Sequence, residues 1–326
     1  MQQLTLAAAA LMAVAATASS PPLARYEARR LSMACVYDIA AYGAAAENVP
    51  AVLEKALDEV DRIDRLMSHY RPQSPLSQLN RDAAAGTVVV DSELFDLIAR
   101  SVDYSRETAG AFDVTVGPLM KAWGFFKGDG RVPADAELAE VMQRVGYRHV
   151  VLNRPSRTIR FDVAGVEIDL GGIAKGYAVD RVVTLLQQHG ITSALVSAGG
   201  STVYGLGHPP DQASWDVKIQ DPLNPAKVAF TVGLEDRALS MAGRSAKTFE
   251  ANGVVYSHIM DPRTGRPVQG VVSVAVTSLT GTDGDALDDA LFVMGVTQSR
   301  AYLRHFPSSS AWFWMTSESG ARLVRF

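Results

Sequence analysis

Residues 169–180 contain paired glycines followed by Lys175, a combination suited to binding a phosphate. A glycine turn at the start of a helix exposes backbone N–H groups, which together with the helix dipole favour an anion. The amides of Gly171 and Gly172, with the Lys175 ammonium, would then fix the phosphate. The same glycines would also serve a tight strand-to-helix turn beside a solvated lysine. From these residues alone, both interpretations stay open.

Residues 283–289 concentrate carboxylates at the start of an expected helix. Asp285 and Asp289 are four residues apart, so on a helix they lie on one face and are able to share a cation. Oxygen ligands suit Mg²⁺ or Ca²⁺ rather than a transition metal. The helix macrodipole also favours carboxylates at this end without any metal. Both explanations account for the pattern.

Residues 258–265 combine a histidine with a turn signal. His258 ends an expected strand at 254–257, and an imidazole titrates near neutral pH, so it is a candidate general base. The alternative is a half-buried histidine at a strand end. Asp261, Pro262 and Gly265 are typical of a turn and need no functional explanation.

Residues 110–119 and 123–125 place Asp113 among glycine, phenylalanine and tryptophan. Such a segment would line a slot for a flat aromatic ligand, or form a packed loop in which Asp113 caps backbone groups. Upstream, residues 68–70 and 77–80 bracket a polar loop after a long helix. There Tyr70 would stack on a ring system or cover the core.

Composition excludes several classes of protein. The chain has 326 residues, of which 48% are hydrophobic and 20% charged, which is typical of a folded globular protein. Its net charge of −4 offers no excess of cations for a nucleic acid backbone. The single cysteine, Cys35, excludes an internal disulfide and a CxxC site. The GxGxxG, GxxxxGK[ST], HExxH and GxSxG motifs are absent.

The N-terminus has the pattern of a secretory leader. Residues 4–18 form an apolar run that is too short to span a bilayer, and residues 16–18 provide a small-x-small cleavage site. We therefore expect residues 1–22 to be a cleavable signal peptide and the protein to be exported, to the periplasm in a Gram-negative source. The residues before Cys35 do not form a lipidation signal.

Helices and strands alternate with frequent hairpins along the rest of the chain. A 3.6-residue apolar period over 49–67 predicts a long amphipathic helix. Further helices are expected at 92–107 (with Asp91 as N-cap), 135–145, 173–188 and 285–294. Strands are expected at 33–41, 149–153, 158–163, 166–170, 194–197, 215–220, 228–232, 254–257 and 271–278. The pattern favours an α+β fold with a mostly antiparallel sheet. Without a Pro/Gly-rich linker, residues 23–326 are expected to form one compact two-lobed unit.

Taken in order, these segments resemble the ApbE family of FAD:protein FMN transferases. The matching stretches are residues 111–119, 123–125, 169–180, 196–200, 239–243, 258–265 and 285–295. The resemblance implies a T-fold-like α+β architecture, dependence on Mg²⁺, and FAD as the donor substrate. It also implies transfer of FMN through a phosphoester bond to a Ser or Thr hydroxyl of another protein, with release of AMP.

The resemblance also assigns site residues by position. His258 matches the residue often proposed as the base. The Mg²⁺ site would comprise the Gly172 carbonyl, Asp285, Asp288 and Asp289. Positions matching FAD contacts are Met33, Tyr70, Ala111, Phe112, Asp113, Asp169, Lys175, His258 and Ile259. Acceptors in the family include subunits of membrane-bound redox complexes, so the resemblance implies peripheral contact with a membrane. It implies no nucleic acid partner.

Two departures from the family pattern affect these expectations. The helix that usually reads Asp-Ala-Leu-Ala-Thr has Asp288 and Asp289 at its last two positions. The additional charge would hold a cation more tightly, repel a diphosphate or admit a second metal. A turn that usually reads Ser-Thr-Ser-Gly is Ser-Met-Ala-Gly at 240–243, which removes a hydroxyl. The alternatives are an Mg²⁺-dependent FAD pyrophosphatase yielding FMN and AMP, and a non-catalytic FAD-binding protein.

Overall fold

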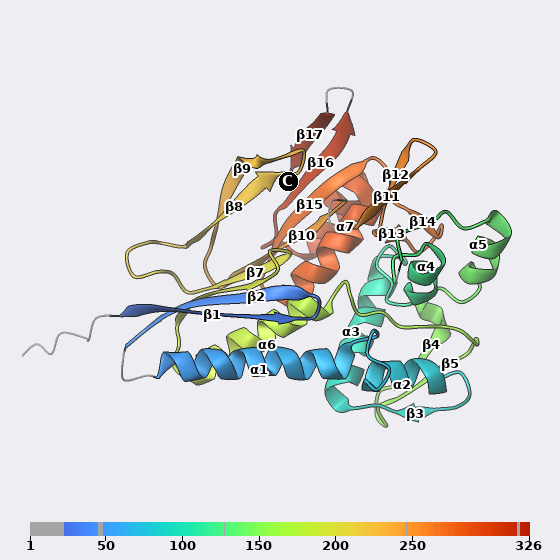
Figure 1. Ribbon diagram of the computed structural model, residues 1–326, viewed down its shortest axis with the longest axis horizontal. Coiled ribbons are helices and arrows are strands. Elements are labelled where there is room, and N and C mark those ends of the chain that lie inside the picture. The colour runs from blue at the N-terminus through green and yellow to red at the C-terminus, as the bar shows by residue number, and fades with distance from the viewer. Residues whose placement is uncertain (1–22, 45–47, 127, 245–246, 318–319) are drawn as a thin grey trace, which may run out of the picture.

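A computed structural model describes residues 23–326 apart from 45–47, 127, 245–246 and 318–319. Within this part of the chain, the largest sheet has the strand order β1-β2-β6-β7-β10-β15-β16-β17, and each neighbouring pair is antiparallel (Figure 1). The expected mixed α+β fold with a mostly antiparallel sheet is confirmed. The strands are β1 (Ala24–Ser32), β2 (Cys35–Gly43), β6 (Ser193–Ala198), β7 (Thr202–Leu206), β10 (Arg237–Gly243), β15 (Val271–Ser278), β16 (Ala311–Ser317) and β17 (Gly320–Arg325).

Helices cover one face of this sheet, with α1 and α6 beneath β1 and β2, and α7 beside β10 and β15 (Figure 1). They are α1 (Val49–Met67), α2 (Pro75–Asp82), α3 (Ser92–Glu107), α4 (Gly117–Ala122), α5 (Asp135–Met142), α6 (Ala174–Gln188) and α7 (Gly281–Tyr302). The smaller sheets are β3 (Val88–Val89) with β5 (Thr158–Phe161) and β4 (Val150–Asn153), β8 (Trp215–Asp221) with β9 (Asn224–Leu234), β11 (Thr248–Ala251) with β12 (Val254–Ser257), and β13 (Met260–Asp261) with β14 (Arg266–Pro267).

The apolar periods in the sequence explain which faces are buried. In β2, Tyr37, Ile39 and Ala41 alternate with more exposed residues and enter the core, as the two-residue period of a strand requires. In α1 the residues of the 3.6-residue period, such as Leu53 and Leu57, form the buried face. The prediction of this helix is confirmed at both ends.

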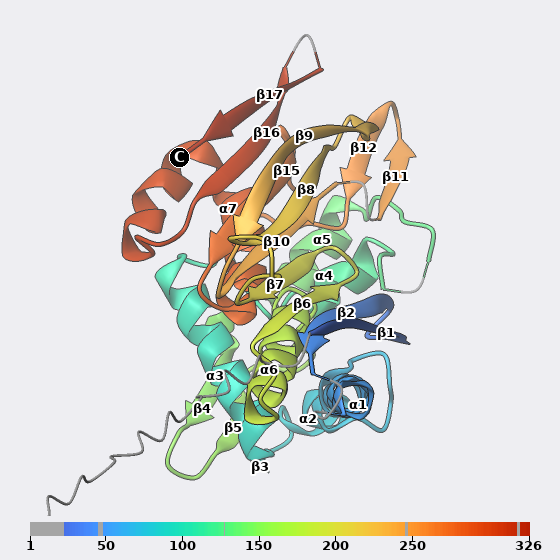
Figure 2. The same ribbon diagram turned by 90° about the vertical axis from the view of Figure 1, so that its left-hand side faces the viewer.

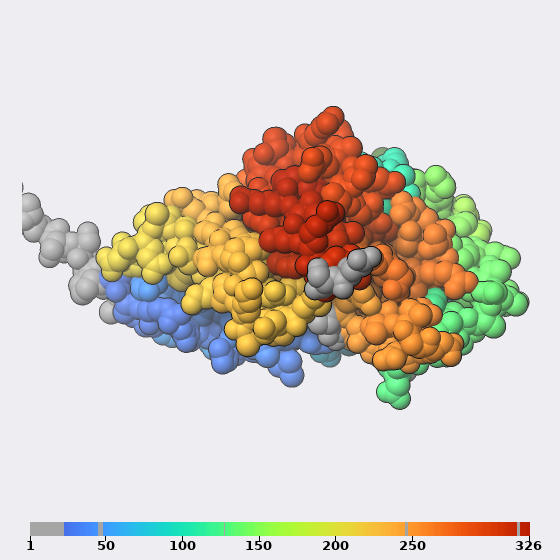
Figure 3. Space-filling view, turned by 90° about the horizontal axis from the view of Figure 1, so that it is seen from above, coloured from blue at the N-terminus to red at the C-terminus, as the bar shows by residue number. Residues whose placement is uncertain are grey.

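The central strand β15 is buried on both faces. Val274 and Val276 pack in one cluster with Leu287 and Leu291 of α7. Between them, Ala275 belongs to a second cluster, which includes residues of the β8–β9 ribbon. This ribbon lies across the sheet beside β15, as Figure 2 shows. From above, the yellow segment that contains β8 and β9 lies next to the red C-terminal strands (Figure 3). The helix α7 therefore packs against a strand that is fixed from both sides.

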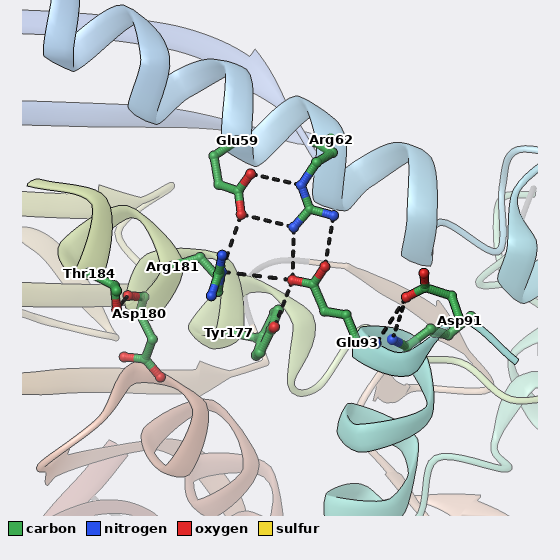
Figure 4. Close-up of polar contacts among 9 residues, drawn as sticks. Glu59, Arg62, Asp91, Glu93, Tyr177, Asp180, Arg181 and Thr184 are labelled. Carbon is green, nitrogen blue, oxygen red and sulfur yellow. Dashed lines mark hydrogen bonds and ion pairs between the residues drawn. The ribbon is translucent and has the colours of Figure 1, made fainter. Parts of the chain in front are cut away.

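A polar network joins α6 to α1 and α3 (Figure 4). Arg62 of α1 forms ion pairs with Glu59 at 2.7 Å and with Glu93 of α3 at 2.7 Å. Glu93 accepts a hydrogen bond from Tyr177 of α6 at 2.7 Å, and Arg181 approaches Glu59 to within 3.2 Å. The network fixes the first turns of α6, which carry Lys175 and Gly176.

The segment 166–170 does not form the strand that its apolar residues predicted. The Asn80 side chain takes the place of a neighbouring strand, because its amide donates to the Ile168 carbonyl at 2.9 Å and accepts from the Ile168 N–H at 2.8 Å. A side chain that satisfies both backbone groups removes the need for a partner strand. The sequence pattern could not distinguish these two arrangements.

The loop expected between residues 68–70 and 77–80 is present and leads into α2, which Ser74 caps by accepting the Ser77 N–H. Two further local predictions were wrong. Residues 239–243 lie in β10 and not in a turn. The first expected strand begins at Cys35, because Met33 and Ala34 form the turn that connects it to β1, with φ angles of 48° and 59°.

The helix carrying the aspartate cluster begins earlier than expected. It begins at Gly281, where Thr280 accepts the N–H of Asp283 at 3.0 Å. The prediction that it ends at Gly295 was wrong: Gly295 is non-helical, with φ 67° and ψ 175°, but the helix resumes after it and ends at Tyr302. The helix predicted at 135–145 ends at Met142.

The described helices include none with the length and hydropathy needed to cross a bilayer. The expected leader, residues 1–22, lies outside the described residues.

We predict that Asn80→Ala destabilises the protein, because it leaves both backbone groups of the buried Ile168 without their partner. The expected loss in the free energy of unfolding is roughly 2–4 kcal/mol, measured by urea denaturation. Gln78→Ala on the same helix is the control, since its amide donates at an exposed position. Its expected cost is below about 0.5 kcal/mol. Equal losses in the two variants would contradict this account of segment 166–170.

Candidate functional site

The first turns of α6 and α7 meet backbone to backbone. A Cβ on Gly176 would lie 2.0 Å from the carbonyl oxygen of Gly281, and a Cβ on Gly281 would lie 2.6 Å from the carbonyl oxygen of Gly176. A side chain at either position would therefore push the helices apart. Gly284 makes a similar approach to the sheet, where a Cβ would lie 2.5 Å from the Ser240 hydroxyl. These three glycines bring the aspartate cluster against the glycine turn.

Asp180 of α6 fixes the start of α7. Its carboxylate accepts the N–H groups of Gly281 at 2.6 Å and Thr282 at 2.8 Å, and the Thr282 hydroxyl at 2.5 Å. These bonds satisfy helix N–H groups that have no partner within α7. In Figure 4 the Asp180 carboxylate points away from the ion network and toward α7. Burial raises the pKa of Asp180, and the bonds from Thr282 and Gly281 oppose that shift.

The Asp285 carboxylate joins α7 to α6 and to the sheet. It accepts the Gly176 N–H at 3.0 Å and the Thr202 hydroxyl of β7 at 3.1 Å. The Ser240 hydroxyl of β10 donates in turn to the Thr202 hydroxyl at 3.4 Å. Asp285 is only 3% exposed. Its position is therefore fixed by α6 and β7, and β10 supports Thr202.

Lys175 is the cation nearest this cluster. Its Nζ lies 3.9 Å from the nearer Asp285 oxygen and donates to the Gly171 carbonyl at 3.2 Å. The Asp285 charge raises the pKa of Lys175, so the ammonium stays protonated. Burial, followed by the charges of Asp289 and Asp285, raises the pKa of Asp288 well above its usual range. Burial and the charge of Asp285 raise the pKa of Asp289 to about 7.

The donor set is compatible with Mg²⁺, although the described residues contain no group of three His, Cys, Asp or Glu side chains arranged as a metal site. Mg²⁺ usually takes one or two protein carboxylates and completes its shell with water and substrate phosphates. Asp285 and Asp289 supply two carboxylates facing the glycine turn. A Cβ on Gly172 would lie 2.5 Å from an Asp289 oxygen, so that residue and the turn are adjacent. The ligand roles of Gly172, Asp285, Asp288 and Asp289 stay predictions.

Asp169 accepts the hydrogen bond of Gly171, one of the two glycines whose N–H groups were expected to bind a phosphate. Its Oδ1 accepts the Gly171 N–H at 2.8 Å and lies 3.1 Å from Nδ1 of His69. The Asp169 N–H donates to the Val114 carbonyl at 2.7 Å, which ties the turn to the segment that contains Asp113. The Gly171 amide therefore serves the turn itself, and the phosphate-binding hypothesis now rests on Gly172 and Lys175.

The segment around Asp113 is a packed loop. The Asp113 carboxylate accepts from Thr115 through its N–H at 2.9 Å and its hydroxyl at 2.7 Å, and from the Tyr147 N–H at 2.7 Å. These contacts match the backbone-capping alternative. Burial raises the pKa of Asp113. Ala111 is buried, and the Phe112 ring reaches the glycine turn, 3.4 Å from where a Cβ on Gly172 would lie.

His258 directly follows β12, as the sequence indicated. Its N–H donates to the Lys247 carbonyl at 3.1 Å, whereas Nδ1 of its ring is buried with no hydrogen-bond partner. Burial, followed by the charges of Lys247 and Lys175, lowers the pKa of His258 to about 4. The imidazole is therefore neutral at pH 7. Ile259, the next residue, is buried, and its carbonyl accepts the Val268 N–H at 3.0 Å.

Tyr70 and Met33 occupy loops. Tyr70 is 39% exposed and stacks on Phe126, with ring centroids 4.8 Å apart. Met33 lies in the β1–β2 turn, where its sulfur accepts the Tyr37 hydroxyl at 3.3 Å. The Asp285 charge acts on the same Tyr37 hydroxyl, and the assignment of Met33 as an FAD contact stays a prediction.

Sequence reasoning missed three groups that complete the site. Thr202 bonds to Asp285, Lys247 bonds to the backbone of His258, and His69 pairs with Asp169. Only His69 had a sequence signal, through its place beside Tyr70 in a polar segment. The other two come from strands or loops far along the chain and carry no distinctive local pattern.

Buried polar atoms without a partner concentrate in this region. Of the four such side-chain atoms among the described residues, three belong to His69, Ser257 and His258. Buried polar groups are nearly always paired in folded proteins, so unpaired ones call for an explanation. A polar ligand that supplies the missing hydrogen-bond partners is one such explanation.

Comparison with known proteins identifies the proteins to which this chain is similar. The family model described as "ApbE family" matches residues 33–313. An FAD:protein FMN transferase of Treponema pallidum is 35% identical over 82% of this chain and 78% of its own length. The Vibrio cholerae enzyme of the same name is 34% identical over 74% of each chain. Among solved structures, the ApbE protein of Thermotoga maritima is 31% identical with a TM-score of 0.84, covering 93% of this chain and 97% of that one.

We predict that His258 makes the protein less stable in acid. Its folded pKa of about 4 lies below the unfolded value of 6.5, so between these values the unfolded chain binds more protons. Stability is therefore lost as the pH falls from about 6.5 to about 4. His258→Gln should remove this loss, which is worth roughly 2–3 kcal/mol. Urea denaturation of both proteins from pH 7 to pH 4 measures it, and parallel stability curves would contradict the assignment.

Proposed function

This chain belongs to the ApbE family, and we propose that it transfers the FMN half of FAD to a Ser or Thr hydroxyl of another protein. The observation that carries the proposal is the arrangement of the glycine turn and half-buried Lys175 of α6 against the carboxylates of α7, where the two helices touch backbone to backbone. Relatives over most of the chain are named FAD:protein FMN transferases. The geometry suits a diphosphate substrate.

The reaction breaks one phosphoanhydride bond and forms one phosphoester bond. The acceptor oxygen attacks the phosphorus on the FMN side of the diphosphate and loses its proton to a base. The bond from that phosphorus to the bridging oxygen breaks, and AMP leaves with that oxygen and the electron pair. In such reactions most of the catalysis is positioning and neutralisation of charge.

The chain's own groups divide this work. His258, neutral at pH 7, takes the proton of the acceptor hydroxyl. The Lys175 ammonium and the Gly172 amide hold the diphosphate beside the turn. Tyr70 provides a ring face for stacking. Asp285 holds the Gly176 amide and thereby keeps the start of α6 in place.

Mg²⁺ would be held by Asp285 and Asp289 with the Gly172 carbonyl. When bound, it would neutralise the charge that develops on the leaving phosphate. Asp288 lies within the same buried set and adds negative charge there. The extra carboxylate relative to the usual family helix strengthens attraction for a cation and opposes the diphosphate when no cation is present.

The acceptor is proposed to be an exported protein or an exposed subunit of a membrane-bound redox complex. This follows from the leader expected at residues 1–22 and from the acceptors of the family. A periplasmic location follows if the source is Gram-negative.

The transfer is tested by incubating the protein with FAD, Mg²⁺ and a threonine-containing periplasmic acceptor domain. Intact mass spectrometry should show the acceptor heavier by one FMN phosphoryl unit, and chromatography should show AMP in equal amount. His258→Ala should still bind FAD while losing transfer about 100-fold or more. Free FMN and AMP without a modified acceptor would indicate a pyrophosphatase, and intact FAD would indicate a binding protein. Either result would overturn the proposal.

We predict that Asp285→Asn abolishes Mg²⁺-dependent transfer while the protein stays folded. The amide keeps an oxygen able to accept the Gly176 N–H, but it removes the charge that attracts a cation. The expected loss in turnover is about 100-fold or more. Asp283→Asn is the matched control, because Asp283 bonds to Tyr104 and Arg100 at the edge of the cluster. Equal activity in the two variants would remove Asp285 from the proposed metal site.

A further inference from the structure

A histidine outside the assigned residues forms an oriented pair with Asp169. Nδ1 of His69 lies 3.1 Å from the Asp169 oxygen that also accepts the Gly171 N–H. The pKa of Asp169 is lowered although burial opposes this, because His69 and the Gly171 amide stabilise the charged form. An ionised carboxylate only accepts hydrogen bonds, so Nδ1 of His69 carries the hydrogen. In the neutral ring, Nε2 is then a hydrogen-bond acceptor.

This acceptor has no partner in the described part of the chain. Nε2 of His69 is buried and receives no hydrogen bond. The ring is 13% exposed and packs against Tyr70, with centroids 3.9 Å apart, and Phe126, at 5.2 Å. A buried acceptor without a donor costs free energy. Its orientation is nevertheless fixed by Asp169 on one edge and by packing against the Tyr70 and Phe126 rings.

His69 and Tyr70 line a cavity of about 240 Å³ beside Asp169. Pockets that enclose a whole drug-sized ligand are about 300–1,000 Å³, so this cavity is sized for one ring system of a larger molecule. Its aromatic wall, in which Tyr70 and Phe126 are stacked with an interplanar angle of 14°, suits a flat ring.

Other polar side chains around the cavity already have partners. Asn80 bonds to the Ile168 backbone, and Lys121 pairs with Glu167 at 2.6 Å. Arg81 donates to the Pro72 carbonyl at 2.7 Å. Nε2 of His69 is thus a free acceptor in a ring-sized space.

We propose that His69 is a specificity-determining residue whose Nε2 accepts a hydrogen bond from an N–H group of a nitrogen heterocycle seated against Tyr70 and Phe126. The inference rests on the proposed function, in which the ligand is FAD. That molecule offers two such donors, the ring N3–H of the isoalloxazine and the amino group of adenine. Both present the same chemistry to Nε2.

The test measures binding of four probes to the full chain by titration calorimetry. The probes are FMN, 3-methyl-FMN, AMP and N6,N6-dimethyl-AMP, in which methylation removes the donor. In the wild type, methylation should weaken binding of one pair roughly tenfold, which identifies the ring. In His69→Phe, which keeps the aromatic packing, that penalty should disappear and the unmethylated probe should bind as weakly as the methylated one. His189→Gln, at the exposed end of α6, should leave the penalty intact.

Several results would overturn the proposal. One is an equal methylation penalty in the wild type and in His69→Phe, and another is no penalty in the wild type. If His69→Phe does not fold, the ¹⁵N resonance of Nε2 in wild-type protein provides the test. It should shift on adding the preferred probe and not on adding its methylated form, and an unchanged resonance would overturn the proposal. Wild-type protein that binds FAD yet shows no penalty refutes only this inference, whereas failure to bind FAD refutes the proposed function as well.

Discussion

The contact between the Asp285 carboxylate and the Gly176 amide connects the two halves of the site. One half is the glycine turn at the start of α6, and the other is the aspartate cluster on α7. The contact exists because Gly176 and Gly281 allow the helices to approach until their backbones touch. Asp180 then fixes where α7 begins, and the ion network of α1 and α3 fixes α6. Each of these features serves to hold a carboxylate beside a phosphate-sized turn.

The charge balance of the site explains why it calls for a ligand. Lys175 faces Asp285, Asp288 and Asp289, and burial together with mutual repulsion raises the pKa of Asp288 and Asp289. A divalent cation would relieve that repulsion, and a diphosphate would then restore the balance of charge. The lowered pKa of His258 has the same first cause, burial, to which the charges of Lys247 and Lys175 add. Burial thus favours the neutral forms of both the imidazole and the carboxyl groups.

The sequence predicted the long helix and the fold class well and the individual strands less completely. Helix α1, the hairpin β4–β5 and strands β2, β6 and β15 follow from apolar periods and turn residues, whereas β1, β7, β10, β16 and β17 of the largest sheet were not predicted. Segment 166–170 has the composition of a strand, and only the distant Asn80 shows why it is not one. In the site, the spacing of Asp285 and Asp289 placed both on one helix face. Thr202 and the pairing of His69 with Asp169 depend on tertiary contacts between residues far apart in the chain, which local patterns do not contain.

The most direct measurement of the central claim is a crystal structure of the protein with FAD and Mg²⁺ bound. The account predicts that the diphosphate lies between the glycine turn at Gly172 and the carboxylates of Asp285 and Asp289, within reach of Lys175. A diphosphate bound elsewhere on the molecule, with those carboxylates still held only by Gly176 and Thr202, would contradict it.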